Sequence, residues 1–349
     1  MQVNIALKQV VDNSYDITID TITPTYFDTK VAIITNPKVA GLHLSYLLSK
    51  ITAKELYVIT VPDGEEYKNQ ASIDMILESL FNHKFNRKSM LIAFGGGVIG
   101  DMTGFAASIY QRGISFMQVP TTLLSQVDAS VGGKTGMNNG YGKNLIGAFH
   151  QPKAVLIDPH FLSTLPAREF GAGVAEIVKM AVTFNRDFFE FLESADLHDA
   201  SVLQEVIKQA VQTKASVVAQ DEKENGIRAA LNYGHTFGHV IENETKYKKY
   251  LHGEAVAIGM VLANETSVAM GMMSADEAKR VKNLLEKYSL PTSYEIKNIE
   301  SFYETFFLDK KSSDSSVTFI LPVGLGDVKI TDSCDKSIIL SVLDKFGAV

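Results

Sequence analysis

The amino-acid sequence predicts an α/β N-terminal domain with a mostly parallel, Rossmann-like sheet, followed by a mainly α-helical C-terminal domain. Short apolar runs alternate with segments of helical periodicity over residues 1–158, a pattern typical of a parallel sheet flanked by helices. The predicted strands are almost continuously apolar, as expected when helices cover both faces of a sheet. From Pro159 onward helical periodicity dominates, so we assign residues 159–349 to the second domain.

The elements of the first domain alternate regularly. Strands are predicted at residues 31–35, 56–61, 90–94, 116–119 and 155–158, and helices at residues 39–51, 72–83 and 101–110. In the helix at 72–83, Ile73, Ile76 and Leu80 fall on one side.

The second domain is predicted to be helical with one small hairpin. Helices are predicted at residues 161–193, 201–220, 232–247, 254–270 and 275–288. The hairpin is predicted from strands at 317–321 and 327–330, because the residues between them include a proline and glycines that favour a turn.

The composition is that of a globular enzyme with 349 residues, of which 46% are hydrophobic and 21% charged. A net charge of −7 argues against nucleic acid or an anionic membrane as a partner. The single cysteine, Cys334, excludes an intrachain disulfide and a cysteine-rich metal site. Residues 1–11 do not resemble a signal peptide, and no apolar stretch is long enough to span a membrane, so we expect a cytoplasmic protein.

The most informative segment contains three of the eight histidines within 18 residues. His235 and His239 are spaced to share one face of the helix predicted there, and Asn232 precedes them by one turn on that face. His252 could complete a metal site from the next element, because neutral imidazole is a common metal ligand. The alternative is a helix with solvated or buried structural histidines, but the loops described next favour the metal site.

A glycine-rich loop follows the predicted strand at 90–94. Gly95, Gly97 and Gly100 satisfy the pattern G-x-G-x-x-G between a strand and a helix, which lets backbone amides approach a pyrophosphate. Glycines at such a place also serve tight packing. The loop follows roughly the third predicted strand and not the first, so the topology is expected to differ from the standard dinucleotide fold. Residues 63–68 follow the second strand, where carboxylates can accept hydrogen bonds from ribose hydroxyls; a solvated turn is the alternative.

Residues 132–144 contain five glycines and three asparagines, which we interpret as excluding a stable helix or strand. The resemblance of its start to a phosphate-binding P-loop fails, because Asp128 stands where an earlier glycine is required. What remains is a flexible loop carrying Lys134 and Lys143, suited to a phosphorylated or carboxylated substrate. A mobile surface loop is the alternative.

Glu176 and Lys179 lie three residues apart amid small and apolar neighbours. Such a pair is most often an ordinary surface ion pair, but these surroundings indicate a partly buried carboxylate that could complete a site of two histidines and one carboxylate. Other charged residues are unremarkable by themselves; they are Arg112, Lys214, Glu224, Arg228, Asp309, Lys310 and Lys311.

Together these segments resemble the 3-dehydroquinate synthase family, sugar-phosphate cyclases of the shikimate pathway, over nearly the whole chain. The most specific pieces are residues 95–101, 128–144, 161–166, 175–179 and 232–242. Ala129, where a serine is expected, is a minor departure.

The resemblance implies a homodimer that binds NAD and a divalent metal, zinc or cobalt. It implies Glu176, His235 and His252 as metal ligands, which corrects the spacing argument, and it places His239 beside the substrate in proton transfer. The implied substrate contacts are Asp128, Lys134, Lys179, Lys214, Arg228 and Asn232, together with Arg112 reaching from the partner subunit. Either Lys310 or Lys311 would also face the substrate. The implied NAD contacts are Asp63, Gly64, Glu65, Glu66, Tyr67, Lys68, Gly96, Gly97, Val98, Ile99, Gly100, Asp101, Thr121, Thr122, Lys134, Lys143, Phe161, Leu162, Ser163 and Thr164.

The implied reaction converts 3-deoxy-D-arabino-heptulosonate 7-phosphate to 3-dehydroquinate and phosphate. It proceeds by transient oxidation with NAD, elimination of phosphate, reduction and intramolecular aldol closure. The nearest alternative is a metal-dependent polyol or glycerol dehydrogenase, which would not need the lysine-bearing loop. Another sugar-phosphate cyclase and a non-catalytic NAD-responsive regulator are further alternatives.

Overall fold

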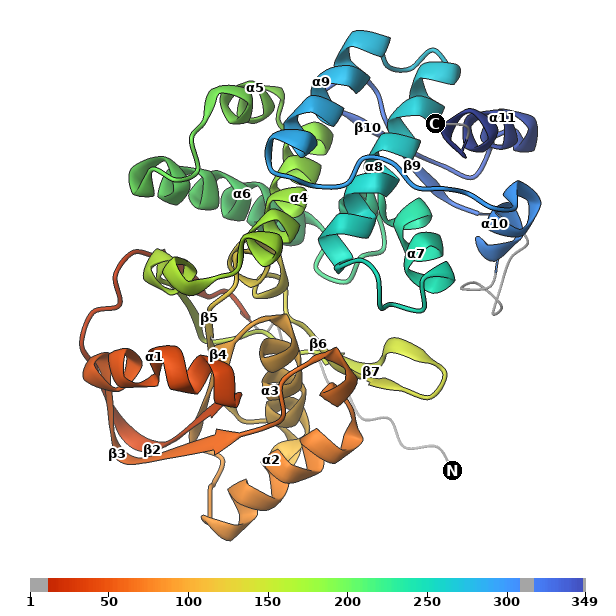
Figure 1. Cartoon of the computed structure of the whole chain (residues 1–349). Coiled ribbons are helices and arrows are strands. Elements are labelled where there is room, and N and C mark those ends of the chain that lie inside the picture. The colour runs from red at the N-terminus through yellow and green to blue at the C-terminus, as the bar shows by residue number, and fades with distance from the viewer. Residues whose placement is uncertain (1–11, 308–316, 348–349) are drawn as a thin grey trace, which may run out of the picture.

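A computed structural model describes residues 12–307 and 317–347 (Figure 1). Residues 1–11, which were expected not to be a signal peptide, therefore lie outside the described residues. The two candidate substrate lysines at 310 and 311 lie outside them as well. The sheet and its flanking helices form one half of the molecule, and the helices from α4 (Ala167–Phe184) onward form the other (Figure 1).

A six-stranded parallel sheet, with strand order β1-β8-β5-β4-β2-β3, organises the first half. Its strands are β1 (Asp16–Ile19), β2 (Thr25–Thr35), β3 (Ile51–Thr60), β4 (Met90–Gly95), β5 (Ser115–Pro120) and β8 (Ala154–Ile157). The strand order reverses between β2 and β4, and ligands of open α/β sheets bind at the carboxyl end of such a reversal. The parallel sheet and its unusual topology were both predicted, whereas β1 was not.

Helices cover both faces of this sheet. They are α1 (Pro37–Lys50), α2 (Gln70–Asn82) and α3 (Gly97–Ile109), with the short turns η1 (Glu65–Tyr67) and η2 (Tyr110–Arg112). Asn36 starts α1 by accepting a hydrogen bond from the Val39 amide at 2.8 Å, and Pro37 occupies its first turn. Neighbouring residues of β2 point to opposite faces: Ala32 packs with α2 and α3, and Ile33 packs with α1.

The structure overturns one prediction in this half. Residues 132–144 were expected to exclude a strand, but β6 (Lys134–Asn139) and β7 (Gly142–Phe149) form an antiparallel hairpin. Two glycines explain why: a Cβ on Gly147 would lie 2.1 Å from the carbonyl oxygen of Thr135, and one on Gly136 would lie 2.6 Å from that of Ile146. The glycines thus permit close approach of two strands here, and the hairpin is an ordered arm (Figure 1).

The second half consists of helices around a large apolar core. They are α4 (Ala167–Phe184), α5 (Arg186–Ser194), α6 (Ala200–Gln220), α7 (His235–Glu244), α8 (His252–Ala269), α9 (Ala275–Lys287), α10 (Ile299–Thr305) and α11 (Lys336–Gly347). The predicted hairpin is present as β9 (Phe319–Pro322) and β10 (Val328–Thr331). Short turns precede these helices at η3 (Ser125–Ala129, a π-helix), η4 (Pro159–Thr164) and η5 (Ile227–Asn232). Of the helices that the structure describes, none is both long and apolar enough to cross a membrane.

Two helix predictions in this half were partly wrong. The single helix expected at 161–193 is divided into η4, α4 and α5. The extended backbone of Asn185 ends α4, and its side chain caps α5 by accepting a hydrogen bond from the Phe188 amide at 2.9 Å. The histidine helix begins only at His235, because Gly234 has a φ of +82°. Asn232 therefore belongs to η5 and not to the face that carries His235 and His239.

Helix α8 is the central helix of the second half and is buried over most of its length. It approaches its neighbours at two glycines: a Cβ on Gly253 would lie 2.2 Å from the carbonyl oxygen of Ala172, and one on Gly259 would lie 2.0 Å from that of Gly234. The start of α8 is held against α4 by Arg168, whose guanidinium donates to both oxygens of Glu254 at 2.6 Å each.

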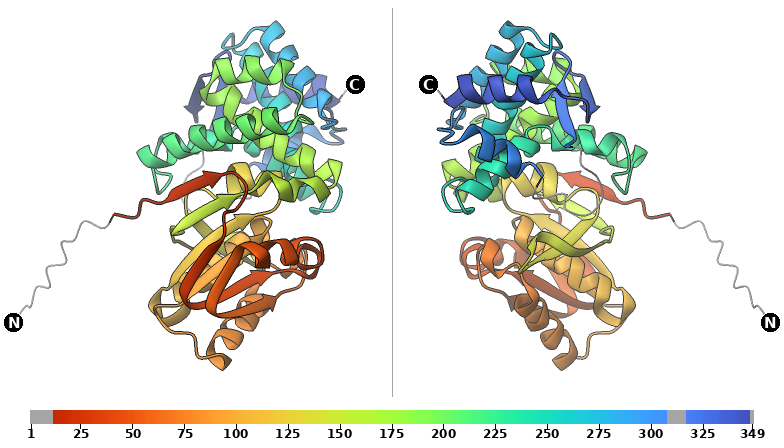
Figure 2. Two further views of the ribbon diagram at one scale, coloured as in Figure 1. Left: turned by 90° about the vertical axis from the view of Figure 1, so that its left-hand side faces the viewer. Right: turned by 90° about the vertical axis from the view of Figure 1, so that its right-hand side faces the viewer.

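The first strand joins the two halves. β1 lies at the edge of the sheet beside α6, as both views of Figure 2 show. Gln204 of α6 donates a hydrogen bond to the carbonyl oxygen of Ile19 at 2.9 Å. This contact joins α6 of the second half to the edge strand of the sheet.

Candidate functional site

Three residues that are far apart in sequence converge beside the sheet. The potential ligand atoms of Glu176, His235 and His252 lie within 4.8 Å of one another. Glu176 comes from the middle of α4, whereas the two histidines are the first residues of α7 and α8. The close packing of α8 against α4 and α7 sets their separation.

Both histidines turn the same ring nitrogen toward Glu176. Their Nε2 atoms lie 4.0 Å (His235) and 3.8 Å (His252) from Oε1 of Glu176. Nδ1 of His235 lies 3.2 Å from the carbonyl oxygen of Tyr233, which can only accept, so Nδ1 carries the proton and Nε2 a lone pair. Burial, followed by the nearby charge of Lys179, lowers the pKa of His235 well below its usual range, which keeps the imidazole neutral.

Glu176 is fully buried, and its Oε2 pairs with the ammonium of Lys179 along α4. Its Oε1, which faces the two histidine Nε2 atoms, accepts no hydrogen bond from the described residues. A buried carboxylate oxygen without a partner is costly, and a divalent cation would satisfy it. Two neutral imidazoles and one carboxylate suit zinc or a similar ion and leave coordination positions open. The residues present therefore fit a metal of this class.

His239 lies next to this group without being part of it. Its ring centroid is 5.5 Å from that of His235 and 6.3 Å from that of His252. It therefore borders the space in front of the three potential ligands, one helical turn beyond His235.

Buried cations surround the same place. Lys214 of α6 donates to both the carboxylate and the main-chain carbonyl of Asp128, each at 2.6 Å. Burial would raise the pKa of Asp128, but the charges of Lys214 and Lys179 overcome it and hold the pKa far below its usual range. Burial also lowers the pKa of Lys214, against the attraction of Asp128. Burial would lower the pKa of Lys179 too, but the negative charges of Glu176 and Asp128 outweigh burial and raise that pKa above its usual value.

A second group of polar residues connects the hairpin with the loop after α6. Glu224 pairs with Lys134 of β6 and accepts a hydrogen bond from the Asn232 side chain at 2.8 Å. Arg228 is buried, and its guanidinium donates to the carbonyl oxygen of Gly132 at 3.2 Å and to that of Glu222. Glu224 has no predicted role, and its position in the sequence between Lys214 and Arg228 is the only signal that points to it.

The glycine loop lies where strand β4 passes into α3. Gly96 is the N-cap of α3 and provides no side-chain hydrogen bond, so the amides of the first turn are not capped by that residue. A Cβ on Gly96 would meet the Thr122 side chain at 3.2 Å, and one on Gly97 would meet Ala129 at 3.3 Å. An uncapped helix start at the carboxyl end of a parallel strand suits a pyrophosphate, so these residues fit a dinucleotide.

Other expected dinucleotide contacts lie at this edge of the sheet. Lys68 is buried and connects α3 with the hairpin, because its ammonium donates to Asp101 at 2.5 Å and to Asn144. Asp63, which follows β3, accepts a hydrogen bond at 2.7 Å from Asn36, which follows β2. The remaining expected NAD contacts in this region follow β3 or β5, directly or in the adjacent turn; they are Gly64, Glu65, Glu66, Tyr67, Thr121 and Thr122.

The expected contacts in η4 are placed less favourably. Phe161 and Leu162 are buried core residues, and the Phe161 ring packs 5.3 Å from that of Phe94, so its side chain does not face a ligand. Val98 and Ile99 likewise pack with the core on the α2 and α3 side. Thr164 pairs its hydroxyl with Nε2 of His43 at 2.7 Å.

Arg112 lies apart from the glycine loop of its own chain. It is exposed in the turn η2, after the end of α3, whereas the glycine loop lies at the start of that helix. At about 1.5 Å per residue, α3 separates the two by roughly 20 Å. Gln111 and Arg112 have positive φ values of 49° and 69°, a backbone conformation that turns the chain sharply here.

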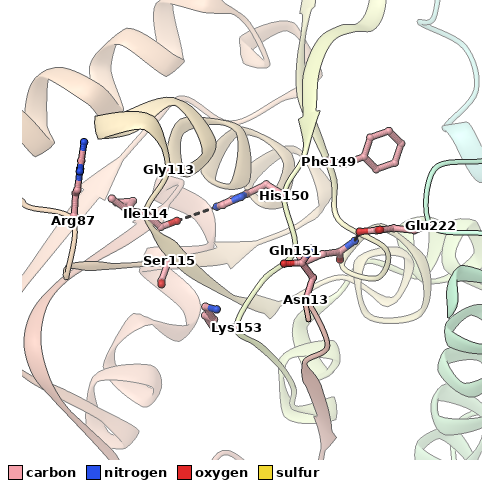
Figure 3. A pocket seen from close by; sticks show the side chains of 10 residues that line it. All are labelled: Asn13, Arg87, Gly113, Ile114, Ser115, Phe149, His150, Gln151, Lys153 and Glu222. Atoms are coloured by element: carbon pink, nitrogen blue, oxygen red, sulfur yellow. Dashed lines mark hydrogen bonds between the residues drawn. The ribbon is translucent and has the colours of Figure 1, made fainter. Parts of the chain in front are cut away.

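A separate cavity of about 340 Å³ opens at the amino ends of the strands, with Ser115 and Lys153 on its wall. Figure 3 shows His150 pointing toward the carbonyl of Ile114 and Gln151 toward Glu222. None of the residues expected to bind substrate, NAD or metal lines this cavity. It lies at the sheet edge opposite the glycine loop.

Comparisons with known proteins agree with the arrangement. The family models described as "3-dehydroquinate synthase N-terminal" and "3-dehydroquinate synthase C-terminal" match residues 58–172 and 173–312. A curated 3-dehydroquinate synthase from Sulfurimonas denitrificans is 74% identical over 347 residues, covering 99% of this chain and 99% of that protein.

Two solved structures share the fold. The 2-epi-5-epi-valiolone synthase ValA from Streptomyces hygroscopicus, with NAD+ and Zn2+ bound, has a TM-score of 0.87 and 26% identity and covers 99% of each chain. A 2-deoxy-scyllo-inosose synthase complexed with carbaglucose-6-phosphate, NAD+ and Co2+ has a TM-score of 0.80 and 27% identity, covering 92% of this chain and 91% of that one.

Proposed function

The chain belongs to the 3-dehydroquinate synthase family, and from that premise we propose how its own residues perform the family's reaction. It is an NAD- and metal-dependent, phosphate-eliminating cyclase of the shikimate pathway. We propose that residues 1–158 bind NAD and residues 159–349 bind the metal and most of the substrate. The convergence of Glu176, His235 and His252 beside the buried cations carries this assignment.

Glu176, His235 and His252 would hold the divalent metal. A bound metal would supply a Lewis acid for the C5 oxygen of the substrate, and bound NAD would supply reversible hydride transfer at that carbon. The contribution of the protein is to hold the ligand nitrogens deprotonated and in place, which the hydrogen bond from His235 to Tyr233 favours.

The cations would hold the two anionic ends of the substrate. Lys214 and Arg228 suit the carboxylate, and Lys134 with Arg112 of the partner suits the phosphate. Lys134, Lys179 and Lys214 each already face a carboxylate of this chain, so binding exchanges internal pairs for substrate contacts. Such a site fixes one conformer of a highly charged molecule.

His239 would assist proton transfer during elimination. The phosphate of the substrate is the base that removes the proton, and His239 supports that transfer from beside the metal ligands. Asn232 and Asp128 border the same space and would orient hydroxyl groups of the substrate.

We further propose a cytoplasmic homodimer in which Arg112 completes the site of the neighbouring subunit. Its position at the far end of α3 supports this, since that placement takes it away from the glycine loop of its own chain. Closure of the two halves around the substrate would exclude water.

The deciding experiment uses purified protein with zinc, a catalytic amount of NAD and the heptulosonate phosphate. Release of inorganic phosphate in many turnovers per NAD, with 3-dehydroquinate as product, is expected. Glucose 6-phosphate in the same assay tests the related cyclase activities; the 74% identity to a 3-dehydroquinate synthase, against 26% to ValA, favours the heptulosonate. Net accumulation of NADH with glycerol, without phosphate release, would contradict the proposal in favour of a polyol dehydrogenase.

A further inference from the structure

Glu242 of α7 is a buried carboxylate that the reaction described above does not use. Only 4% of its surface is exposed, and it lies three residues after His239 on the helix that His235 begins. A carboxylate is seldom buried without charged or hydrogen-bonding partners, so its neighbours indicate its purpose.

The first neighbour is His252. Nδ1 of His252 lies 3.4 Å from Oε1 of Glu242, while Nε2 of the same ring lies 3.8 Å from Glu176. The two nitrogens thus face two different carboxylates. A proton on Nδ1, held by Glu242, leaves the lone pair on Nε2 directed toward the place where the metal would bind.

The comparison with His235 makes the assignment specific. Nδ1 of His235 lies 3.2 Å from the main-chain carbonyl oxygen of Tyr233, so its acceptor belongs to the backbone. His252 has the side chain of Glu242 in the corresponding position, 3.4 Å from its Nδ1. A side-chain substitution can therefore remove the support of His252 but not that of His235.

The second neighbour is Lys143 of the hairpin. Its ammonium lies 3.6 Å from the same Oε1 of Glu242 and 4.2 Å from the ring centroid of Tyr247. The ion pair joins β7 to α7, which lie near one another in Figure 1. Lys143 is also an expected NAD contact. Oε1 of Glu242 therefore contacts both His252, a proposed metal ligand, and Lys143, a proposed NAD contact.

We propose that Glu242 is a positioning residue that orients His252 for the metal and holds Lys143 of the hairpin at the NAD site. The inference rests on the proposed metal and NAD contacts. A carboxylate behind a metal-bound histidine fixes the tautomer and raises the basicity of the ligand nitrogen, and its removal typically weakens metal binding about 10–100-fold.

The test is Glu242→Gln, which preserves shape and removes the charge. Zinc affinity is measured by competition with a chromogenic chelator, and NAD affinity by fluorescence titration of the zinc-loaded protein. We expect zinc affinity to fall about 10–100-fold and NAD affinity to fall as well, with an unchanged melting temperature of the metal-free protein. Glu244→Gln, on the same helix but bonded to the Tyr294 hydroxyl, is the matched control and should change neither affinity.

Lys143→Gln separates the two roles. It should weaken NAD without changing zinc affinity, and combining it with Glu242→Gln should weaken NAD little further, because both changes remove one ion pair. Fully additive NAD effects would overturn the part of the inference that concerns the hairpin.

His235→Ala distinguishes failure of this inference from failure of the proposed site. If that variant loses zinc while Glu242→Gln binds zinc within threefold of the unsubstituted protein, Glu242 does not position His252 and the metal site stands. If His235→Ala retains zinc with unchanged affinity, the ligand set is wrong and the inference falls with it.

Discussion

The ammonium of Lys214 donates two hydrogen bonds to Asp128, one to its carboxylate and one to its main-chain carbonyl oxygen, each at 2.6 Å. The contact joins α6 to the π-helical turn after β5, so it connects the helical half with the sheet. Lys214 is buried and forms an ion pair with Asp128. Its replacement by an uncharged residue would therefore leave the Asp128 carboxylate without this partner.

Lys214→Met is therefore expected to lower the free energy of unfolding by about 2 kcal/mol and to lower activity by at least about 100-fold. Urea unfolding and phosphate release measure the two effects. Lys208→Met is the control, because Lys208 forms an exposed pair with Glu205 on the same helix at 3.1 Å and should cost less than about 1 kcal/mol. Equal effects of the two substitutions would contradict the structural role of the pair.

Variants of His235 and His239 should differ in the amount of metal that they bind. His235→Ala is expected to lose metal and activity together, because it removes one of three potential ligands. His239→Ala is expected to keep a stoichiometric metal ion and to slow turnover by about 10²–10⁴-fold, as for loss of a proton-transfer group. Metal analysis of both purified variants checks this, and loss of metal from the His239 variant would show that its role is misassigned.

The pair of Glu224 with Lys134 predicts a pH dependence of stability. Burial opposes ionisation of Glu224, but Lys134 and Asn232 hold its pKa below the ordinary value of 4.5. The contribution of ionised Glu224 to the free energy of unfolding is therefore complete above about pH 4.5. It is lost as the pH falls through the lower pKa that Glu224 has in the folded protein.

Glu224→Gln should thus be less stable than the unsubstituted protein at pH 7, by up to about 1 kcal/mol at low salt because Lys134 is half-exposed. The difference should close below pH 4.5. Melting temperatures from pH 7 to 3.5 measure it, and a difference that does not change with pH would show that the ion pair is not its source.

A mixing experiment tests whether Arg112 acts across a subunit interface. Arg112→Ala and His235→Ala are each expected to be inactive alone. After subunit exchange of equal amounts, half of the dimers should be mixed, and each should contain one complete site, which restores about a quarter of normal activity. No recovery, with mixed dimers demonstrated by mass spectrometry, would place Arg112 in its own chain's site or outside any site.

Local patterns were sufficient for most of the sheet and its helices. Apolar runs at residues 90–94 and 116–119 became β4 and β5, because strands buried on both faces have few alternatives. The pairing of β1 with β8 was not predictable in this way, since β1 is a short strand whose partner lies far along the chain. Such pairing depends on tertiary packing and not on local propensity.

The hairpin shows where composition misleads. Glycine and asparagine are usually unfavourable in strands, yet Gly136 and Gly147 permit a close contact that larger residues would prevent. The histidine spacing misled similarly. It correctly indicated proximity of His235 and His239, but Glu176 reaches the two potential histidine ligands through the crossing of α4 with α8, which no spacing within one helix can indicate.

The close packing of α8 at Gly253 and Gly259 has a consequence for natural variation. Because His252 is the first residue of this helix, a methyl group added at either glycine would displace the imidazole together with the helix. Alleles of this kind would weaken the binding of the divalent metal. Organisms that carry them would require aromatic amino acids on metal-poor medium and grow without them once the trace metal is supplied.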